Sequence, residues 1–145
     1  MRKDGKNKIP CAYVDTDVII RLLTADDLQK QQSAARLFTS VVDNKIVLLA
    51  PVTVIADAVY VLSSARLYHL PRAQIRNLLT TLIKLSGFKV DNKRLVLQAL
   101  EEYAGSNLDF GDAYLIASAR QRKVGTVYSF DRDFDKIDEI IRKEP

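Results

Sequence analysis

Short, continuous apolar runs alternate along this chain with longer segments in which apolar residues recur at helical spacing. The apolar runs cover Cys11–Val14, Lys45–Leu49, Phe88–Val90 and Thr126–Phe130, and each is too short for a helix. Strands that are buried on both faces have this pattern, and the intervening helices supply the crossovers that parallel strands need. The alternation predicts an α/β domain with a mostly parallel sheet and helices on both of its faces.

The helical segments begin or end at recognisable signals. Asp26 or Asp27 can cap one helix and Asp109 another, Pro51 and Pro71 suit a first turn, and Gly87 can stop a helix. The expected helices cover about residues 18–23, 27–42, 52–66, 71–86, 92–103 and 109–123. The tail after Asp131 is charged, and only a few isoleucines there are available for packing.

The length of 145 residues suits one domain, and 48% hydrophobic residues are enough for a core. We expect a basic flexible arm over residues 1–9 and a single domain over residues 10–145. The longest apolar run, Ile46–Ala56, is far shorter than the about 20 residues of a membrane span, so no membrane is expected. The single cysteine, Cys11, excludes an intrachain disulfide, which fits a cytoplasmic protein, and we expect it to be a buried small hydrophobe.

The net charge of +4 is unevenly distributed. Residues 58–100 carry seven basic residues and one acidic residue, whereas residues 10–57 and 101–145 are both net negative. A basic segment can follow a phosphate backbone, so Arg66, Arg72 and Arg76 are candidate RNA-binding residues. Solvated helix faces would produce the same composition, and this alternative stays open.

Carboxylates stand at the ends of the predicted elements. Asp15 ends the first strand, Asp131 follows the strand Thr126–Phe130, and Asp109 and Asp112 share one face at a helix start. In a parallel sheet, Asp15 and Asp131 would lie at the same edge. Asp57 stands within an apolar helix, where a charge is costly unless it is paired or binds a metal.

Converging carboxylates repel one another unless cations neutralise them. Mg²⁺ and Mn²⁺ prefer such oxygen ligands, and two ions about 3.5–4 Å apart can activate water for phosphodiester cleavage. The single histidine and single cysteine argue against zinc. Simpler roles also exist, because Asp109 can be a helix cap, Asp112 can favour a helix N-terminus and Asp131 can be a turn residue.

Three blocks of the sequence together resemble a known family. The blocks YVDTDVIIRLL, PVTVIADAVYVLS and LDFGDAYLIASARQRKVGTVYSFDRDF are similar to those of PIN-domain ribonucleases, particularly VapC-type toxins of toxin–antitoxin pairs. The resemblance implies a three-layer α/β/α sandwich with a mostly parallel central sheet. It also implies an endoribonuclease that depends on Mg²⁺ or Mn²⁺ and cleaves RNA phosphodiesters with a metal-activated water.

The resemblance also implies roles for particular residues and partners. By position, the catalytic acids would be Asp15, Asp57, Asp112 and Asp131, with Asp15, Asp112 and Asp131 as metal ligands. Thr16, Asp109 and Ser129 match supporting positions. The implied partners are an RNA substrate, a cognate antitoxin protein and a second copy in a homodimer.

Two departures from the family pattern favour an alternative function. Asp57 stands where the family normally has Glu, and Asp17 stands where Asn is frequent. The shorter side chain predicts a weak or water-mediated metal contact. The alternative is a catalytically weakened PIN fold that binds RNA or a partner without cutting.

A phosphatase of the haloacid dehalogenase type is a third interpretation. Asp15-Thr16-Asp17 is similar to the paired aspartates of that family, but Val18 stands where its motif has Gly. A downstream aspartate pair is also missing, so this interpretation is the least favoured.

Overall fold

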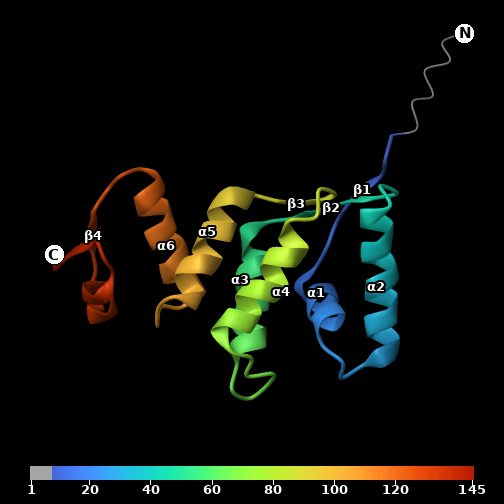
Figure 1. Cartoon of the computed structure of the whole chain (residues 1–145), viewed down its shortest axis with the longest axis horizontal. Helices are drawn as coiled ribbons and strands as arrows, with labels where there is room; N and C mark the ends of the chain where they lie inside the picture. Colours follow the sequence, from blue (N-terminus) through green and yellow to red (C-terminus); the bar gives the residue numbers. More distant parts are fainter. Residues whose placement is uncertain (1–7) are drawn as a thin grey trace, which may run out of the picture.

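The computed structural model describes residues 8–145 as helices and short strands in alternation (Figure 1). The elements in chain order are β1 (Cys11–Tyr13), α1 (Thr16–Leu23), α2 (Leu28–Val42), β2 (Val47–Ala50), α3 (Val52–Ser63), α4 (Arg72–Ile83), β3 (Phe88–Val90), α5 (Lys93–Ala104), α6 (Phe110–Gln121), β4 (Thr126–Tyr128), a 3₁₀ helix η1 (Arg132–Lys136) and β5 (Ile141–Lys143).

Three strands form a parallel sheet with the order β1-β2-β3. Tyr13 lies opposite Leu49 across the first strand pair, and Leu49 lies opposite Lys89 across the second. Helices flank this sheet, so the predicted α/β fold of the PIN-like type with a parallel sheet is confirmed.

Local chemistry explains several element boundaries. The Asp27 carboxylate accepts the N–H of Lys30 at 3.0 Å, which caps α2 as predicted. α4 ends at Ile83, earlier than the glycine signal predicted. Gly87 lies in the turn before β3, where a Cβ would be only 2.9 Å from the side chain of Val41. The glycine therefore permits a close approach between this turn and α2.

The main core lies between the sheet and the helices. Leu48 and Phe88 of the sheet and Ile55, Leu62 and Ile75 of the helices are among its fully buried members. Burying each such side chain contributes about 1.5–3 kcal/mol. A second, smaller cluster lies further along the chain and consists of Leu108, Ile116, Val127 and Phe134.

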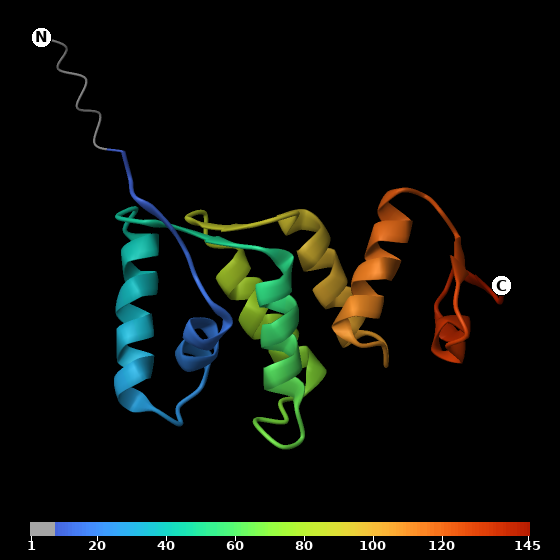
Figure 2. The same cartoon turned by 180° about the vertical axis from the view of Figure 1, so that it is seen from behind.

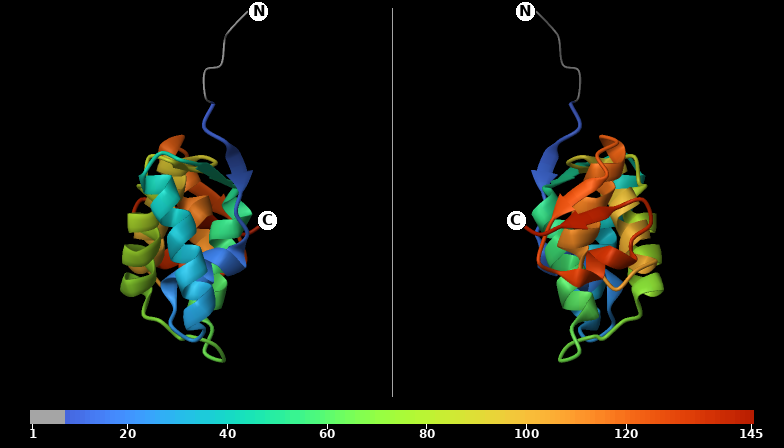
Figure 3. Two further views of the ribbon diagram at one scale, coloured as in Figure 1. Left: turned by 90° about the vertical axis from the view of Figure 1, so that its right-hand side faces the viewer. Right: turned by 90° about the vertical axis from the view of Figure 1, so that its left-hand side faces the viewer.

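The C-terminal strands form a separate sheet. β4 pairs in parallel with β5, and Val127 lies opposite Arg142. In Figures 1 and 2, α5 and α6 stand between these strands and the three-stranded sheet. Figure 3 looks along the long axis, with α2 nearest the viewer at one end and β4 and β5 at the other. The expectation that the strand starting at Thr126 joins the sheet beside Asp15 is therefore not met within one chain.

Other sequence expectations have mixed outcomes. Residues 1–7, most of the expected arm, lie outside the described residues. The expectation of a buried Cys11 is wrong, because it lies on the edge strand β1 and is exposed. Within residues 8–145, no helix is long and apolar enough to cross a membrane. The strand β5 was not predicted, because three residues in a charged tail have no clear pattern.

Candidate functional site

The first acidic group lies where β1 ends and α1 begins. Asp15 caps α1, and its carboxylate accepts the N–H of Thr16 at 2.7 Å. The Thr16 hydroxyl is buried and has no hydrogen-bond partner among residues 8–145. Because a buried polar group without a partner is costly, this hydroxyl is available for a ligand.

Asp57 shares an open depression of about 540 Å³ with Asp15, Thr16 and Asp17. The expectation that Asp57 is a charge embedded among apolar groups is wrong. The neighbours Ile55, Ala58 and Val59 are buried, whereas Asp57 lies on the exposed face of α3. Helical periodicity separates sequence neighbours in space, so the carboxylate incurs little desolvation.

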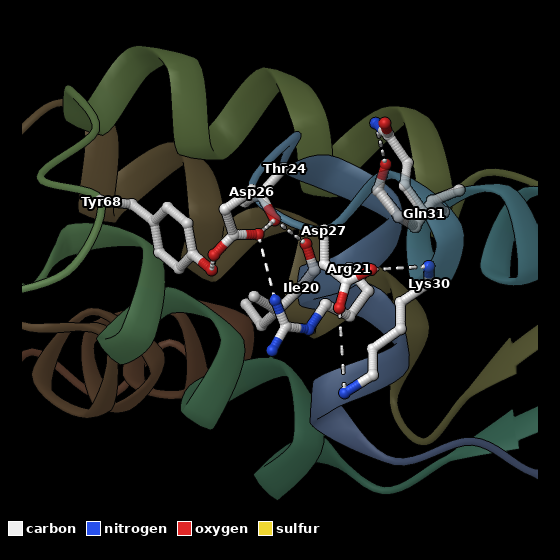
Figure 4. A network of polar contacts seen from close by, with 9 residues as sticks. Ile20, Arg21, Thr24, Asp26, Asp27, Lys30, Gln31 and Tyr68 are labelled. Atoms are coloured by element: carbon white, nitrogen blue, oxygen red, sulfur yellow. Dashed lines mark hydrogen bonds and ion pairs between the residues drawn. The ribbon is translucent and has the colours of Figure 1, made fainter.

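A network of polar contacts holds the wall of this depression (Figure 4). The Tyr68 hydroxyl donates to Asp26 at 2.7 Å, and Arg21 and Thr24 each donate to the same carboxylate at 3.1 Å. The hydrogen bond from Tyr68 is the main cause that lowers the pKa of Asp26, and the same bond raises the pKa of Tyr68. The network joins the loop after α1 to the loop after α3.

The second acidic group lies at the start of α6 and after β4. Asp109 caps α6, and its carboxylate accepts the N–H of Asp112 at 2.8 Å. Burial raises the pKa of Asp112, and the nearby carboxylates of Asp109, Asp131 and Asp133 raise it further. Like charges in a partly buried place favour the protonated acid, or a cation that neutralises them.

The Asp131 turn follows β4 directly. The Ser129 hydroxyl accepts the N–H of Asp131 at 3.0 Å, and the Asp131 carboxylate accepts the N–H of Asp133 at 2.9 Å. Asp131 therefore stabilises the turn and also lies close to Asp112. Asp133 is a further carboxylate of this group that the sequence analysis does not name, although its spacing of two from Asp131 could have indicated it.

The two acidic groups remain separate in a single chain. The first consists of Asp15, Asp17 and Asp57, and the second consists of Asp109, Asp112, Asp131 and Asp133. Tyr60 marks the boundary between them, because it lines the depression of Asp15 and a neighbouring one of about 560 Å³ that Asp109 lines. In the described part of the chain, no three histidine, cysteine or acidic side chains gather closely enough to hold a metal ion. The oxygen donors match the preference of Mg²⁺ or Mn²⁺, but their arrangement in one chain does not form the expected site.

The predicted RNA-binding arginines have different surroundings. The Arg72 guanidinium donates to the carbonyl oxygens of Leu108 at 2.6 Å and Tyr103 at 2.9 Å, and it lies 4.3 Å from the Tyr103 ring centre. Arg76 pairs with Glu101 at 3.5 Å. Arg66 is exposed in the loop after α3. Arg72 thus joins α4 to the segment between α5 and α6, a contact with backbone that sequence reasoning missed.

Comparison with known proteins agrees with this architecture. A search of curated proteins finds no match to the chain. The family model described as "PIN domain" matches residues 12–140, which include both acidic groups. PIN domains are generally nucleases and generally use divalent metals. Since the match spans nearly all of the described residues, the chain belongs to the PIN domain family.

Proposed function

We propose that this protein is an endoribonuclease that depends on Mg²⁺ or Mn²⁺ and acts as the toxin of a toxin–antitoxin pair. The observation that carries the nuclease proposal is the position of the acids. Asp15 and Asp131 each follow a strand of a parallel sheet, and Asp112 lies in the first turn of α6. Ligand sites of α/β proteins lie at such strand ends.

The proposed roles follow from the local chemistry. Asp15, Asp112 and Asp131 would be the metal ligands, because each presents a carboxylate at a strand end or a helix start. A bound cation would neutralise the repulsion between carboxylates that share a site. The unpaired Thr16 hydroxyl could donate to a phosphate oxygen, and Asp57 would complete the acidic wall.

RNA cleavage tests this proposal. Wild-type protein should cut a structured RNA in Mn²⁺, and EDTA should abolish the cutting. The exchange Asp15→Asn should lower the rate at least about 100-fold, as expected for the loss of one charge-stabilising group. Asp43→Asn is the matched control, because Asp43 lies at the C-terminal end of α2, away from both acidic groups. Cutting that survives EDTA or Asp15→Asn would contradict the proposal.

The toxin role has a separate test. Induced expression of the wild type should arrest the growth of a bacterial host, and Asp15→Asn should relieve the arrest. A cognate antitoxin co-expressed from a neighbouring reading frame should also restore growth. Arrest that Asp15→Asn does not relieve would exclude RNA cleavage as its cause.

A binding protein that does not cut is the second candidate function. Two observations favour it: Asp57 stands where the family usually has Glu, and the acids do not gather within residues 8–145 of one chain. Asp57→Glu distinguishes the candidates, because a weakened enzyme should gain cutting when the missing methylene is restored. Equal cutting by the wild type and by Asp57→Glu would discard the binding interpretation.

A further inference from the structure

In the described chain, β1, β3, β4 and β5 each have one open edge, and two of these strands, β1 and β4, carry an exposed tyrosine. On β1, Val14 donates its N–H to Leu49 of β2, so Tyr13, which points its backbone the other way, faces the open edge. On β4, Ser129 donates its N–H to Lys143 next to β5, so the backbone of Tyr128 likewise faces outward. Unpaired strand edges are templates for pairing with another strand.

Large aromatic side chains accompany both open edges. Tyr13 is 75% exposed, Tyr128 is 66% exposed and Phe130 is 74% exposed. Three such side chains at two short strands leave apolar surface that a further strand would cover. Exposed aromatic side chains therefore accompany the open edge of β1 and the open edge of β4.

The C-terminal strands are held away from β1 of their own chain. Phe134 and Val127 pack with Ile116 of α6. Arg142 of β5 pairs with Asp135 at 2.9 Å and donates to the Ser129 carbonyl at 3.0 Å. Residues 122–125 between α6 and β4 can span at most about 14 Å. Since α5 and α6 stand between β4 and the three-stranded sheet, β4 cannot reach its own β1 without unpacking α6 (Figures 1 and 2).

We propose that two copies of this chain pair reciprocally, with β4 of each copy adding in parallel to the open edge of β1 of the other. The result is a closed dimer with two parallel sheets of the order β3-β2-β1-β4-β5, the last two strands coming from the second copy. Each sheet would place Asp15 and Asp57 of one copy beside Asp112 and Asp131 of the other. The strand pairing stands on its own, and the composite catalytic site rests on the proposed nuclease function.

The solvent-exposed area of the chain supports a second copy as the partner that covers the open edges of β1 and β4. The chain exposes 9594 Å², whereas a compact monomer of 16.3 kDa exposes about 7,500 Å². Full exposure of residues 1–7 would account for at most about 1,200 Å² of the difference. The remaining about 900 Å² is close to the about 800 Å² that each partner buries in a stable complex.

The fit between the edges also favours a second copy over an unrelated strand. One chain carries both edges, β1 and β4 have the same length, and both belong to parallel sheets. Parallel pairing brings the carboxyl ends of β1 and β4 together, which joins the two acidic groups that one chain leaves apart. Pairing of two copies would therefore cover the open edges of β1 and β4 and would also bring the two acidic groups into one site.

Crosslinking tests the strand pairing without relying on activity. Cys11 is the only cysteine and lies on β1, so Thr126→Cys adds a second thiol on β4. Adjacent strands lie about 4.8 Å apart, so a short thiol-specific crosslinker should join Cys11 of one copy to residue 126 of the other. The expected product has twice the chain mass. Wild type and the double variant Cys11→Ser, Thr126→Cys should remain uncrosslinked.

Two outcomes of the crosslinking would overturn the proposal. An internal crosslink, seen as a product of single-chain mass with altered mobility, would show that β4 closes onto β1 of its own chain. The absence of any crosslink, together with a single-chain mass in light scattering, would show that the edges do not meet.

Mixing inactive variants tests the composite site. Asp15→Asn and Asp131→Asn should each be inactive alone. In a mixed dimer, one site receives Asp15 from one copy and Asp131 from the other, so it is intact. Random pairing after co-refolding should restore about one quarter of the wild-type rate, because half of the dimers are mixed and each has one intact site.

The two assays separate the two proposals. A mixture that stays inactive while the wild type cuts RNA would show that the acids of one site come from one chain, and would overturn the composite site. If Thr126→Cys forms the dimer crosslink while the wild type never cuts RNA, the strand pairing is upheld and the nuclease proposal is refuted.

Discussion

Arg72 should be a structural residue whose removal lowers stability. Its guanidinium donates to three carbonyl oxygens, those of Leu108 at 2.6 Å, Tyr103 at 2.9 Å and Asn107 at 3.2 Å. It also lies over the Tyr103 ring. The side chain fastens the N-terminal end of α4 to the segment that leads into α6. Replacement by alanine removes all of these contacts at once.

The loss can be worked out from the contacts. The two partly buried bonds each contribute about 1.5 kcal/mol, the lower end of the range for charged donors. The exposed bond to Asn107 adds little, and the contact with the ring adds about 0.5–1 kcal/mol. Arg72→Ala should therefore lower the free energy of unfolding by about 3.5–4 kcal/mol. For a chain of this size, the melting temperature should fall by about 10 °C.

Urea unfolding followed by circular dichroism measures this loss. Arg94→Ala is the control, because Arg94 is exposed on α5, and it should change the free energy of unfolding by less than about 0.5 kcal/mol. A loss below about 1 kcal/mol for Arg72→Ala, with a matching fall in RNA affinity, would refute the structural role. It would support the RNA-binding role that the sequence suggests.

Three further predictions concern stability. Tyr68→Phe should lower the urea midpoint at pH 7. Because the hydrogen bond lowers the pKa of Asp26, its contribution is present above the ordinary value of about 3.9 and lost as the pH falls through the folded value, so the wild type and the variant should converge in acid. Equal midpoints at pH 7 would contradict this. Gly87→Ala should cost about 1–3 kcal/mol, since a Cβ would lie 2.9 Å from a valine side chain of α2, whereas Gly105→Ala, with its nearest contact at 3.4 Å, should cost less in the same urea assay. Phe134→Ala should cost about 3–5 kcal/mol and should expose β4 and β5 to hydrogen exchange before α3, because this ring anchors the second cluster.

Local patterns in the sequence predict most of the elements. β3 occupies the predicted residues Phe88–Val90, and the caps at Asp27 and Asp109 form as expected. These signals involve neighbours within about four residues, which is the range that capping and periodicity describe. The fold class follows from them because alternating strands and helices permit few other architectures.

Long-range contacts explain what the sequence does not predict. The partners of Arg72 are backbone carbonyls more than 30 residues away, and a carbonyl leaves no mark in a sequence. The exposure of Asp57 follows from which face of α3 meets the core, not from its apolar neighbours. Expecting Asp15 and Asp131 at one edge depended on β4 joining the first sheet, and strand order is a tertiary property.

Cleavage of RNA by Asp112→Asn is the most direct test of the claim that the acids at the strand ends and at the start of α6 form a nuclease site. The variant keeps the helix cap, because the Asp112 backbone N–H still donates to Asp109, and it removes only the carboxylate. In Mn²⁺, the wild type should cut a structured RNA and Asp112→Asn should not, with the two proteins showing equal secondary structure by circular dichroism. Cutting by Asp112→Asn at the wild-type rate would contradict the account.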